Sequence, residues 1–491
     1  MSAMRTRPTR LLAAALAAGA LGIWQPRPLA AQALDRSVRP APGPLPTVQT
    51  PNVVKRSLPN GLQVWTVTQR ELPTINASLV IRAGAVHDGD KAGLASMTAS
   101  VLDEGTSRHS SLEFARAVDA LGANLGAFAS DERTTVTLST LKKTGDQAFT
   151  LMGELVTQPA FAAEEIERDR KSRLQSLRQQ KDQPTTIASN TFAAKVYGAG
   201  HPYGRPGNGT PESIGAITRE DIAAFYGSLY RPNNAVLVIV GDVTADEAVA
   251  LATKAFGSWE KGEVPASVAA IPPRPAARAA AVYLVDKPGA AQSEIRIGHP
   301  GAARSTNPDY YALQVLNTIL GGQFSSRINL NLRESKGYTY GARSGWTFAR
   351  GDGPFVASAG VFTAKTDSSL VEFLRELRDI RAGRPVTEEE VAFAKRTIVQ
   401  GYPRALETNA GVVNQLADLA FFGLPEAEMT NFLTRVQAVK PADVTRVARR
   451  YLQPDQFTIV VVGDLSQIRS GIEALNLGPV TVLDADGMAL K

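Results

Sequence analysis

Hydrophobic and polar residues alternate along the chain in two successive series, each with strand patterns first and helical patterns after them. Strand patterns open the two series at residues 62–69, 75–84, 281–288 and 292–300. Each is rich in β-branched or aliphatic residues. Helical periodicity follows in each series, as at residues 111–121 and 363–383. Strands followed by helices predict an α+β fold.

An internal repeat indicates that the two series are copies of one unit. Residues 221–242 read DIAAFYGSLYRPNNAVLVIVGD, and residues 443–464 read DVTRVARRYLQPDQFTIVVVGD. The segments align without a gap, and each predicts a helix, a proline-containing turn and a buried strand ending in Gly-Asp. Their offset of 222 residues far exceeds the ~20–50 residue period of solenoid repeats. We therefore predict two duplicated domains, each a mostly antiparallel sheet with helices packed on one face.

A segment rich in Pro and Ala, EVPASVAAIPPRPAARAA, separates the two copies. Another Pro-rich segment precedes the first predicted strand, where it predicts an extended leader. The pattern near the C-terminus leaves open whether the last residues form an edge strand or a loose tail. The predicted divisions are a signal peptide at 1–33, a leader at 34–54, a first domain at 55–262, a linker at 263–280, a second domain at 281–475 and a tail at 476–491.

The N-terminus has the composition of a secretory signal peptide. Three arginines precede the apolar run LLAAALAAGALGIW, and small residues follow it in PLAAQA. The run is too short to span a bilayer, although an uncleaved anchor is the alternative. Cleavage after Ala33, or after Ala31, would remove four arginines and lower the formal charge from +6 to +2. This small charge argues against a nucleic-acid partner.

The chain of 491 residues contains no cysteine, which excludes disulfides and thiolate zinc sites. Together with the N-terminal pattern, this composition predicts bacterial export to the periplasm, with no membrane attachment after signal cleavage.

Several sequence blocks, in order, carry a family resemblance. They are LPNGLQVWTV, IRAGAVHDGDKAGLA, HPYGRPGNGTPESI and GGQFSSRINLNLRESKGYTYGARS. With these blocks, nearly the whole mature chain resembles the pitrilysin/insulinase-type metallopeptidases, which include the processing peptidases. The resemblance implies the inverted zinc motif H-x-x-E-H within the predicted helix GLASMTASVLDEGT.

The residues at the motif positions cannot perform the zinc chemistry. Two His at i and i+4 would bind the metal from one helix face, and the Glu would activate its water. These positions fall on Ser96, Ser100 and Ala99, respectively. The third ligand, a Glu in the family, falls on Ser176. Since hydroxyl groups are poor zinc ligands and a methyl group moves no proton, we predict no metal and no catalytic residue in this chain.

Other side chains offer no obvious replacement for the motif. The histidines show no i, i+4 pair, and we interpret each as a surface or turn residue: His87, His109, His201 and His299. We interpret Asp103 and Glu104 as the solvated end of the helix. A nucleophilic role for Ser96 or Ser100 would need a His or Lys at a suitable spacing, which the sequence does not show.

The second domain retains a different part of the family pattern. The segment LRESKGYTY matches L-R-E-x-x-G-x-x-Y, with Gly337 at the turn. The resemblance implies that Arg333 and Tyr340 bind the substrate backbone and stabilise charge near the scissile carbonyl. Guanidinium and phenol groups are donors suited to that role. The alternative is that Arg333 is a surface charge at a helix end and Tyr340 an ordinary strand aromatic.

The resemblance to bacterial two-subunit members implies a division of labour. This chain would be the non-catalytic, substrate-binding subunit of a periplasmic zinc peptidase heterodimer that cleaves unfolded peptides. A homologous partner would supply H-x-x-E-H and its zinc. The alternative is a binding or assembly protein with the peptidase fold and no role in proteolysis.

Overall fold

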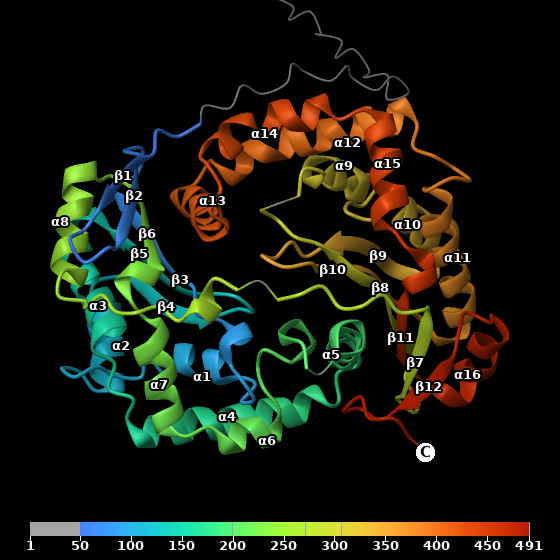
Figure 1. Ribbon diagram of the computed structural model, residues 1–491, viewed down its shortest axis with the longest axis horizontal. Helices are drawn as coiled ribbons and strands as arrows, with labels where there is room; N and C mark the ends of the chain where they lie inside the picture. Colours follow the sequence, from blue (N-terminus) through green and yellow to red (C-terminus); the bar gives the residue numbers. More distant parts are fainter. Residues whose placement is uncertain (1–49, 199, 271, 306, 491) are drawn as a thin grey trace, which may run out of the picture. The chain divides into compact units, whose positions relative to one another are not determined.

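Two six-stranded sheets organise the structure, which is a computed structural model that describes residues 50–490 except 199, 271 and 306 (Figure 1). The described residues belong to one compact unit. The predicted signal peptide and most of the predicted leader lie outside the described residues. In the described part of the chain, no helix is both long enough and apolar enough to cross a bilayer.

The first sheet has the strand order β1-β2-β6-β3-β5-β4. Its strands are β1 (Val54–Ser57), β2 (Gln63–Thr68), β3 (Thr74–Ile81), β4 (Asn124–Ala129), β5 (Thr134–Leu141) and β6 (Ala235–Gly241). The helices of this half are α1 (Leu94–Ser100), α2 (Ser111–Ala120), α3 (Gly145–Thr157), α4 (Ala163–Gln180), α5 (Pro184–Tyr197), α6 (Pro211–Ala216), α7 (Arg219–Leu229) and α8 (Ala245–Phe256). Only β2 and β6 pair in parallel, among the described strands of this sheet.

The second sheet has the order β12-β7-β11-β8-β10-β9. Its strands are β7 (Ala281–Asp286), β8 (Gln292–Ala302), β9 (Thr339–Trp346), β10 (Gly353–Phe362), β11 (Thr458–Gly463) and β12 (Val480–Leu483). Its half contains α9 (Tyr310–Leu320), α10 (Arg327–Asn329), the π-helical turn η6 (Leu330–Ser335), α11 (Thr366–Asp379), α12 (Glu388–Gly401), α13 (Asn409–Phe422), α14 (Ala427–Ala438), α15 (Pro441–Tyr451) and α16 (Leu465–Ala474).

The predicted repeat is confirmed at the level of individual elements. Helix α7, the 3₁₀ turn η4 (Pro232–Asn234) and strand β6 form the first copy. Helix α15, the 3₁₀ turn η9 (Pro454–Gln456) and strand β11 form the second. Both strands pair in parallel with the first long strand of their half and antiparallel with the next. The α+β architecture with two duplicated, mostly antiparallel sheets is therefore confirmed.

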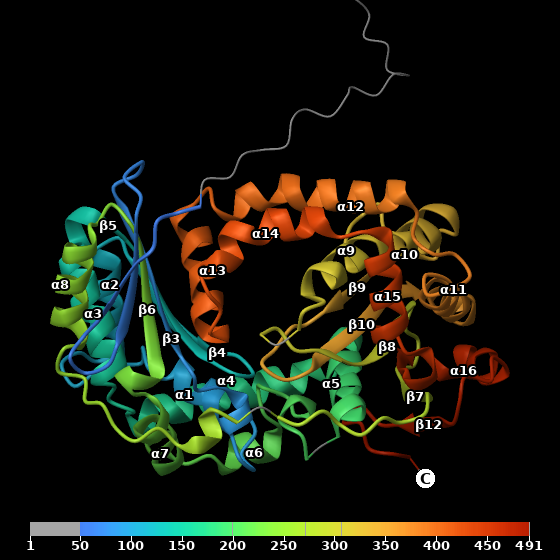
Figure 2. The ribbon, with the colours of Figure 1, turned by 45° about the horizontal axis from the view of Figure 1, so that its top comes forward.

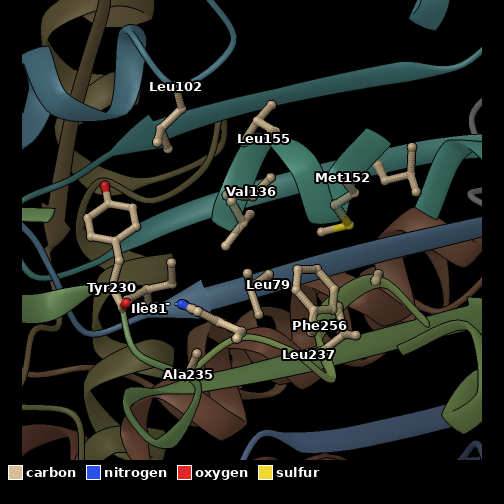
Figure 3. Close-up of a cluster of buried hydrophobic side chains, with 14 of the residues drawn as sticks. Leu79, Ile81, Leu102, Val136, Met152, Leu155, Tyr230, Ala235, Leu237 and Phe256 are labelled. Carbon is tan, nitrogen blue, oxygen red and sulfur yellow. Dashed lines mark hydrogen bonds between the residues drawn. The ribbon is translucent and has the colours of Figure 1, made fainter. Parts of the chain in front are cut away.

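Each sheet packs helices of its own half against one face. In the first half, alternate residues of β3, among them Leu79 and Ile81, point into the same core as Leu237 of β6. Met152 and Leu155 of α3 cover them (Figure 3). A second core of the same kind lies between the second sheet and α9, α11, α15 and α16. This arrangement agrees with the predicted packing on one face.

The opposite face of each sheet is covered by a helix from the other half. Helix α13 packs on β3 and β6, where Leu416 lies in one cluster with Val80 and Val238. Helix α5 packs on β8 and β11, where Phe192 lies in one cluster with Val460. Figure 2 shows α13 beside the first sheet and α5 beside the second. The sequence pattern did not predict that each half covers the other half's sheet with one helix. This exchange of helices is required because β6 and β11 carry apolar residues on both faces.

The tail contains the edge strand β12, which pairs in parallel with β7. The sequence left open whether the last residues form an edge strand or a loose tail, and this pairing shows the edge strand. The predicted linker carries the short 3₁₀ turn η5 (Ala266–Val268) before β7 begins.

Truncation of an exchanged side chain tests how strongly the two halves depend on each other. Leu416 is fully buried between α13 and the first sheet. Leu416→Ala is expected to lower the free energy of unfolding by about 2–5 kcal/mol in urea titrations, because it leaves a cavity. The matched variant Leu72→Ala, at a side chain 63% exposed, is expected to change it by about 0.5 kcal/mol or less. Equal effects of the two variants would show that α13 does not seal this face.

Candidate functional site

A buried carboxylate fixes the start of α1, the helix that carries the degenerate motif. Asp88 is 4% exposed and accepts hydrogen bonds from the backbone N–H groups of Gly93 (2.7 Å) and Ala95 (2.8 Å). Gly93 has a φ of +94°, and a Cβ there would lie 2.9 Å from the Cα of Gly209. Glycine is therefore required where the chain turns into the helix. Burial raises the pKa of Asp88 to about 7, against the lowering effect of its backbone donors.

Arg173 of α4 fills the position between the two serines of the motif. Its guanidinium donates to the Oγ of Ser96 (3.0 Å), the carbonyl of Ser96 (3.0 Å) and the Oγ of Ser100 (2.7 Å). The Nε of Arg173 donates to Asp169 (2.5 Å), one turn earlier on α4. Ser100 donates to the other oxygen of the same carboxylate (2.9 Å). A closed network thus joins α1 to α4.

This donor set does not fit a zinc ion. Both hydroxyl groups already accept hydrogen bonds from a cation, and a guanidinium carries no lone pair for a metal. A divalent ion would also be repelled by the charge of Arg173. Ala99 is fully buried in α1. Among the described residues, no group of three or more His, Cys, Asp or Glu side chains converges on one point.

The remaining sequence-predicted residues around the motif are dispersed. Ser176 lies three residues after Arg173 on α4, has an exposed side chain, and makes no hydrogen bond to Ser96 or Ser100 among the described residues. Burial raises the pKa of Asp103 to about 6. Glu104 accepts a hydrogen bond from Ser111 (2.6 Å) and pairs with Arg168. These two carboxylates are half-buried rather than a fully solvated helix end.

The interpretation of the histidines as surface or turn residues is wrong for His299. This side chain is 2% exposed, and its ring stacks on Phe457 with the centroids 5.5 Å apart. Burial lowers the pKa of His299 to about 4. The other three are half-exposed: His87 lies in a 3₁₀ turn, His109 contacts Glu154 (2.9 Å), and His201 stacks on Tyr197 (5.0 Å).

Arg333 and Tyr340 lie on two consecutive elements with their donor groups at the surface. Arg333, 39% exposed, lies in η6, with its guanidinium 4.5 Å from the ring centroid of Phe324. Its Nε is 3.3 Å from Glu334. Tyr340 of β9 is 78% exposed and touches Phe362 edge to face, 6.0 Å between centroids.

The turn between η6 and β9 depends on glycine. Gly337 has a φ of +65°, and its N–H donates to the carbonyl of Arg333 (3.1 Å). The N–H of Tyr338 then donates to the carbonyl of Leu332 (2.8 Å). This reversal after a helical segment is the helix-ending arrangement that favours glycine. The conformation accounts for glycine in the LRESKGYTY segment.

Sequence reasoning did not find Arg173 and Asp169. Their only local signal is an acid and an arginine at i, i+4 in ERDRKSRLQS, which usually indicates an exposed helix pair. The distinguishing contacts join residues more than 70 positions apart in the chain.

Comparison with known proteins decides the family. The profile of the insulinase family (peptidase family M16) matches residues 64–206, and the profile of the peptidase M16 inactive domain matches residues 216–398. The chain belongs to the insulinase family. The resemblance seen in the sequence is therefore confirmed.

Relatives within the family carry different functional names. The chain is 29% identical to an uncharacterized zinc protease of Mycobacterium leprae, over 74% of this chain and 81% of the relative. It is 23% identical to the non-peptidase homolog YmxG of Helicobacter pylori, over 78% of this chain and 87% of the relative. A solved peptidase M16 inactive domain from Pseudomonas fluorescens is 29% identical, with a TM-score of 0.79 over 84% of this chain and 98% of that one. The chain thus has the peptidase-like fold of a family that includes zinc proteases and a non-peptidase homolog, and its match to the peptidase M16 inactive domain supports a non-catalytic, peptidase-like subunit.

A double-mutant cycle tests the network that fills the motif. Arg173→Met is expected to lower the free energy of unfolding by about 1–3 kcal/mol, because Asp169 loses its cationic partner and the two hydroxyls lose a donor. With Asp169→Leu, the cycle is expected to give a coupling of about 0.5–3 kcal/mol. The control is the exposed pair Arg469 and Glu473, also at i, i+4, with an expected coupling of about 0.3–0.5 kcal/mol. Similar coupling in both pairs would contradict the proposed network.

The pH dependence of stability tests the buried carboxylate at the start of α1. The pKa of Asp88 rises from 3.8 to about 7 on folding, so the folded state binds more protons between these values. Its contribution to stability is present at low pH and is lost as the pH rises toward about 7. Asp88→Asn is expected to make the slope of unfolding free energy against pH less negative, by at most about 1.4 kcal/mol per pH unit. The exposed Asp90→Asn should leave this slope unchanged, and an unchanged slope in Asp88→Asn would exclude the shift.

Proposed function

We propose that this chain is the non-catalytic, substrate-binding subunit of a periplasmic zinc peptidase heterodimer that cleaves unfolded peptides. The observation that carries the proposal is the network of Arg173 with Ser96 and Ser100. It supports the proposal because a fixed cation between these two serines, at the positions expected for the zinc ligands, would repel a metal ion. A homologous subunit with an intact H-x-x-E-H motif would supply the metal and its activated water.

The second half of the chain supports the binding role. Arg333 and Tyr340 present a guanidinium and a phenol at the surface, on elements held by the packed second sheet. In the described residues, the Tyr340 hydroxyl has no hydrogen-bond partner, and Arg333 pairs only with its exposed neighbour Glu334. Breaking such an exposed pair costs little, about 0–1 kcal/mol. Both groups can therefore donate to a peptide carbonyl at little cost.

The periplasmic location is supported by the order of basic, apolar and small residues at the N-terminus. An extended, unfolded substrate suits donors that recognise the backbone, because an extended chain exposes its carbonyl groups to them.

Reconstitution with the partner tests the proposal directly. The mature chain is combined with a purified H-x-x-E-H homologue from the same genome, and cleavage of a quenched fluorescent peptide is followed. Neither chain alone should cleave efficiently, and the mixture should. Arg333→Ala is expected to reduce kcat/KM by about 10-fold or more, because a donor to the reacting carbonyl is lost.

Variants with matched controls separate binding from folding. Tyr340→Phe keeps the ring contact with Phe362 and removes only the hydroxyl, so reduced cleavage would identify that donor. The control Arg116→Ala changes an exposed arginine on α2 and should leave the rate unchanged. Full activity of both Arg333→Ala and Tyr340→Phe would exclude the assigned roles. A heterodimer that forms without any gain in cleavage would favour an assembly protein instead.

A further inference from the structure

A second concave site lies away from the motif and from Arg333, at the contact between the two halves. It is a cavity of about 560 Å³. Arg82, directly after β3, and Arg350, between β9 and β10, both line it. The phenyl rings of Phe421 and Phe422 at the end of α13, and Pro265 of the linker, supply apolar walls. Its volume falls in the range of about 300–1,000 Å³ that small-molecule sites occupy.

Neither arginine that lines the cavity forms a direct ion pair in the described part of the chain. Within the described part of the chain, no carboxylate lies within 4.0 Å of either guanidinium, and none lines the cavity. Arg350 donates to the carbonyls of Val268 (2.8 Å) and Ala269 (2.9 Å). Arg82 donates to the carbonyl of Phe421 at 3.4 Å, a long hydrogen bond. The hydrogen bonds of both guanidiniums therefore go to neutral carbonyl groups, while Glu132 acts on Arg350 through its charge without a direct ion pair.

Two acids near the cavity already have hydrogen-bond or ion-pair partners. Glu132 accepts the backbone N–H of Arg350 (2.9 Å) and the hydroxyl of Tyr203 (2.7 Å). Asp418 of α13 pairs with Arg133 (2.7 Å), whose guanidinium lies over the Phe421 ring. The charges of Asp418 and Arg133 cancel, so this ion pair adds no net negative charge beside the cavity.

The two guanidiniums also act on each other. Burial and the positive charge of Arg350 both lower the pKa of Arg82. Two like charges that share a partly buried site repel each other, and a bound anion would relieve that cost. Sites that retain such a cost are typically sites of function.

We propose that this cavity binds a carboxylate carried on an apolar group. The planar guanidinium forks of Arg82 and Arg350 line the cavity and can bind a carboxylate, Arg350 in exchange for its carbonyl partners. The Phe421 and Phe422 rings and Pro265 accept the apolar part. A carboxylate on an apolar group is found both in a free small acid and in the C-terminal residue of a peptide. The inference is independent of the proposed heterodimer, because it uses none of the motif residues or Arg333 and Tyr340.

Calorimetric titration of the mature chain tests this site with matched ligands. N-acetyl-L-phenylalanine has the carboxylate, and N-acetyl-L-phenylalaninamide is its neutral counterpart. The acid is expected to bind at least about 10-fold more tightly than the amide, because only the acid offers a charge to the two guanidiniums. A six-residue peptide ending in phenylalanine, with a free or an amidated C-terminus, then distinguishes the two sources. If the free-acid peptide binds, the ligand can be a peptide C-terminus, and if only the small acid binds, the ligand is a free acid.

Variants connect the binding to the cavity. Arg82→Gln is expected to weaken binding of the acid by about 10-fold or more, and Arg350→Lys to weaken it by removing the fork while retaining the charge. Arg116→Gln, at an exposed position of α2, should bind as the unchanged chain does. Arg82→Gln should not lower Tm in the absence of ligand, since it removes a repelled charge, and this measurement excludes misfolding as the cause of lost binding.

Three outcomes would overturn the proposal. They are equal binding of the acid and the amide, no binding of the acid up to about 10 mM, and unchanged binding in both Arg82→Gln and Arg350→Lys.

Discussion

The central strands of both sheets are apolar on both faces, and the rest of the architecture follows from the need to cover them. Val238 and Val240 of β6 point away from Leu237 and Ile239, yet all four are fully buried. Helices of the same half cover one face of each sheet. The second face is covered by α13 in one case and by α5 in the other. The hydrophobic effect therefore stabilises the two halves as one unit rather than as two linked domains.

The exchange of helices also creates the places where chemistry can occur. Because α13 crosses the first sheet, its last residues, Phe421 and Phe422, meet Arg82 at the end of β3. Neither half alone would form the cavity lined by both arginines. In contrast, the degenerate motif lies wholly within the first half, between α1 and α4. Among the described residues, the network of Arg173 shares no member with the cavity or with Arg333.

The arginines of this protein differ in how fully they are satisfied, and that difference separates structural from functional candidates. Arg173 has partners for its Nε and both terminal nitrogens, including a carboxylate, so it stabilises the fold. Among the described residues, the guanidiniums of Arg82 and Arg350 hydrogen-bond only to carbonyls, while Arg333 has one exposed carboxylate beside it. Polar groups that the fold leaves unsatisfied are the ones available to a ligand.

The sequence by itself determined the elements, their duplication and the absence of ligand side chains at the motif. Period-2 and period-3.6 patterns are local, and the presence of Ser96, Ala99 and Ser100 can be read directly. It also located Gly337 at a turn, because only a local conformation is involved.

Tertiary structure alone decided which helix covers which face, since an apolar helix such as α13 can pack on any apolar surface of matching shape. It likewise decided that Arg173 lies between the two serines, that His299 is buried, and that Arg82 and Arg350 share one cavity. Each of these depends on contacts between residues far apart in the chain, and a local pattern carries no information about them.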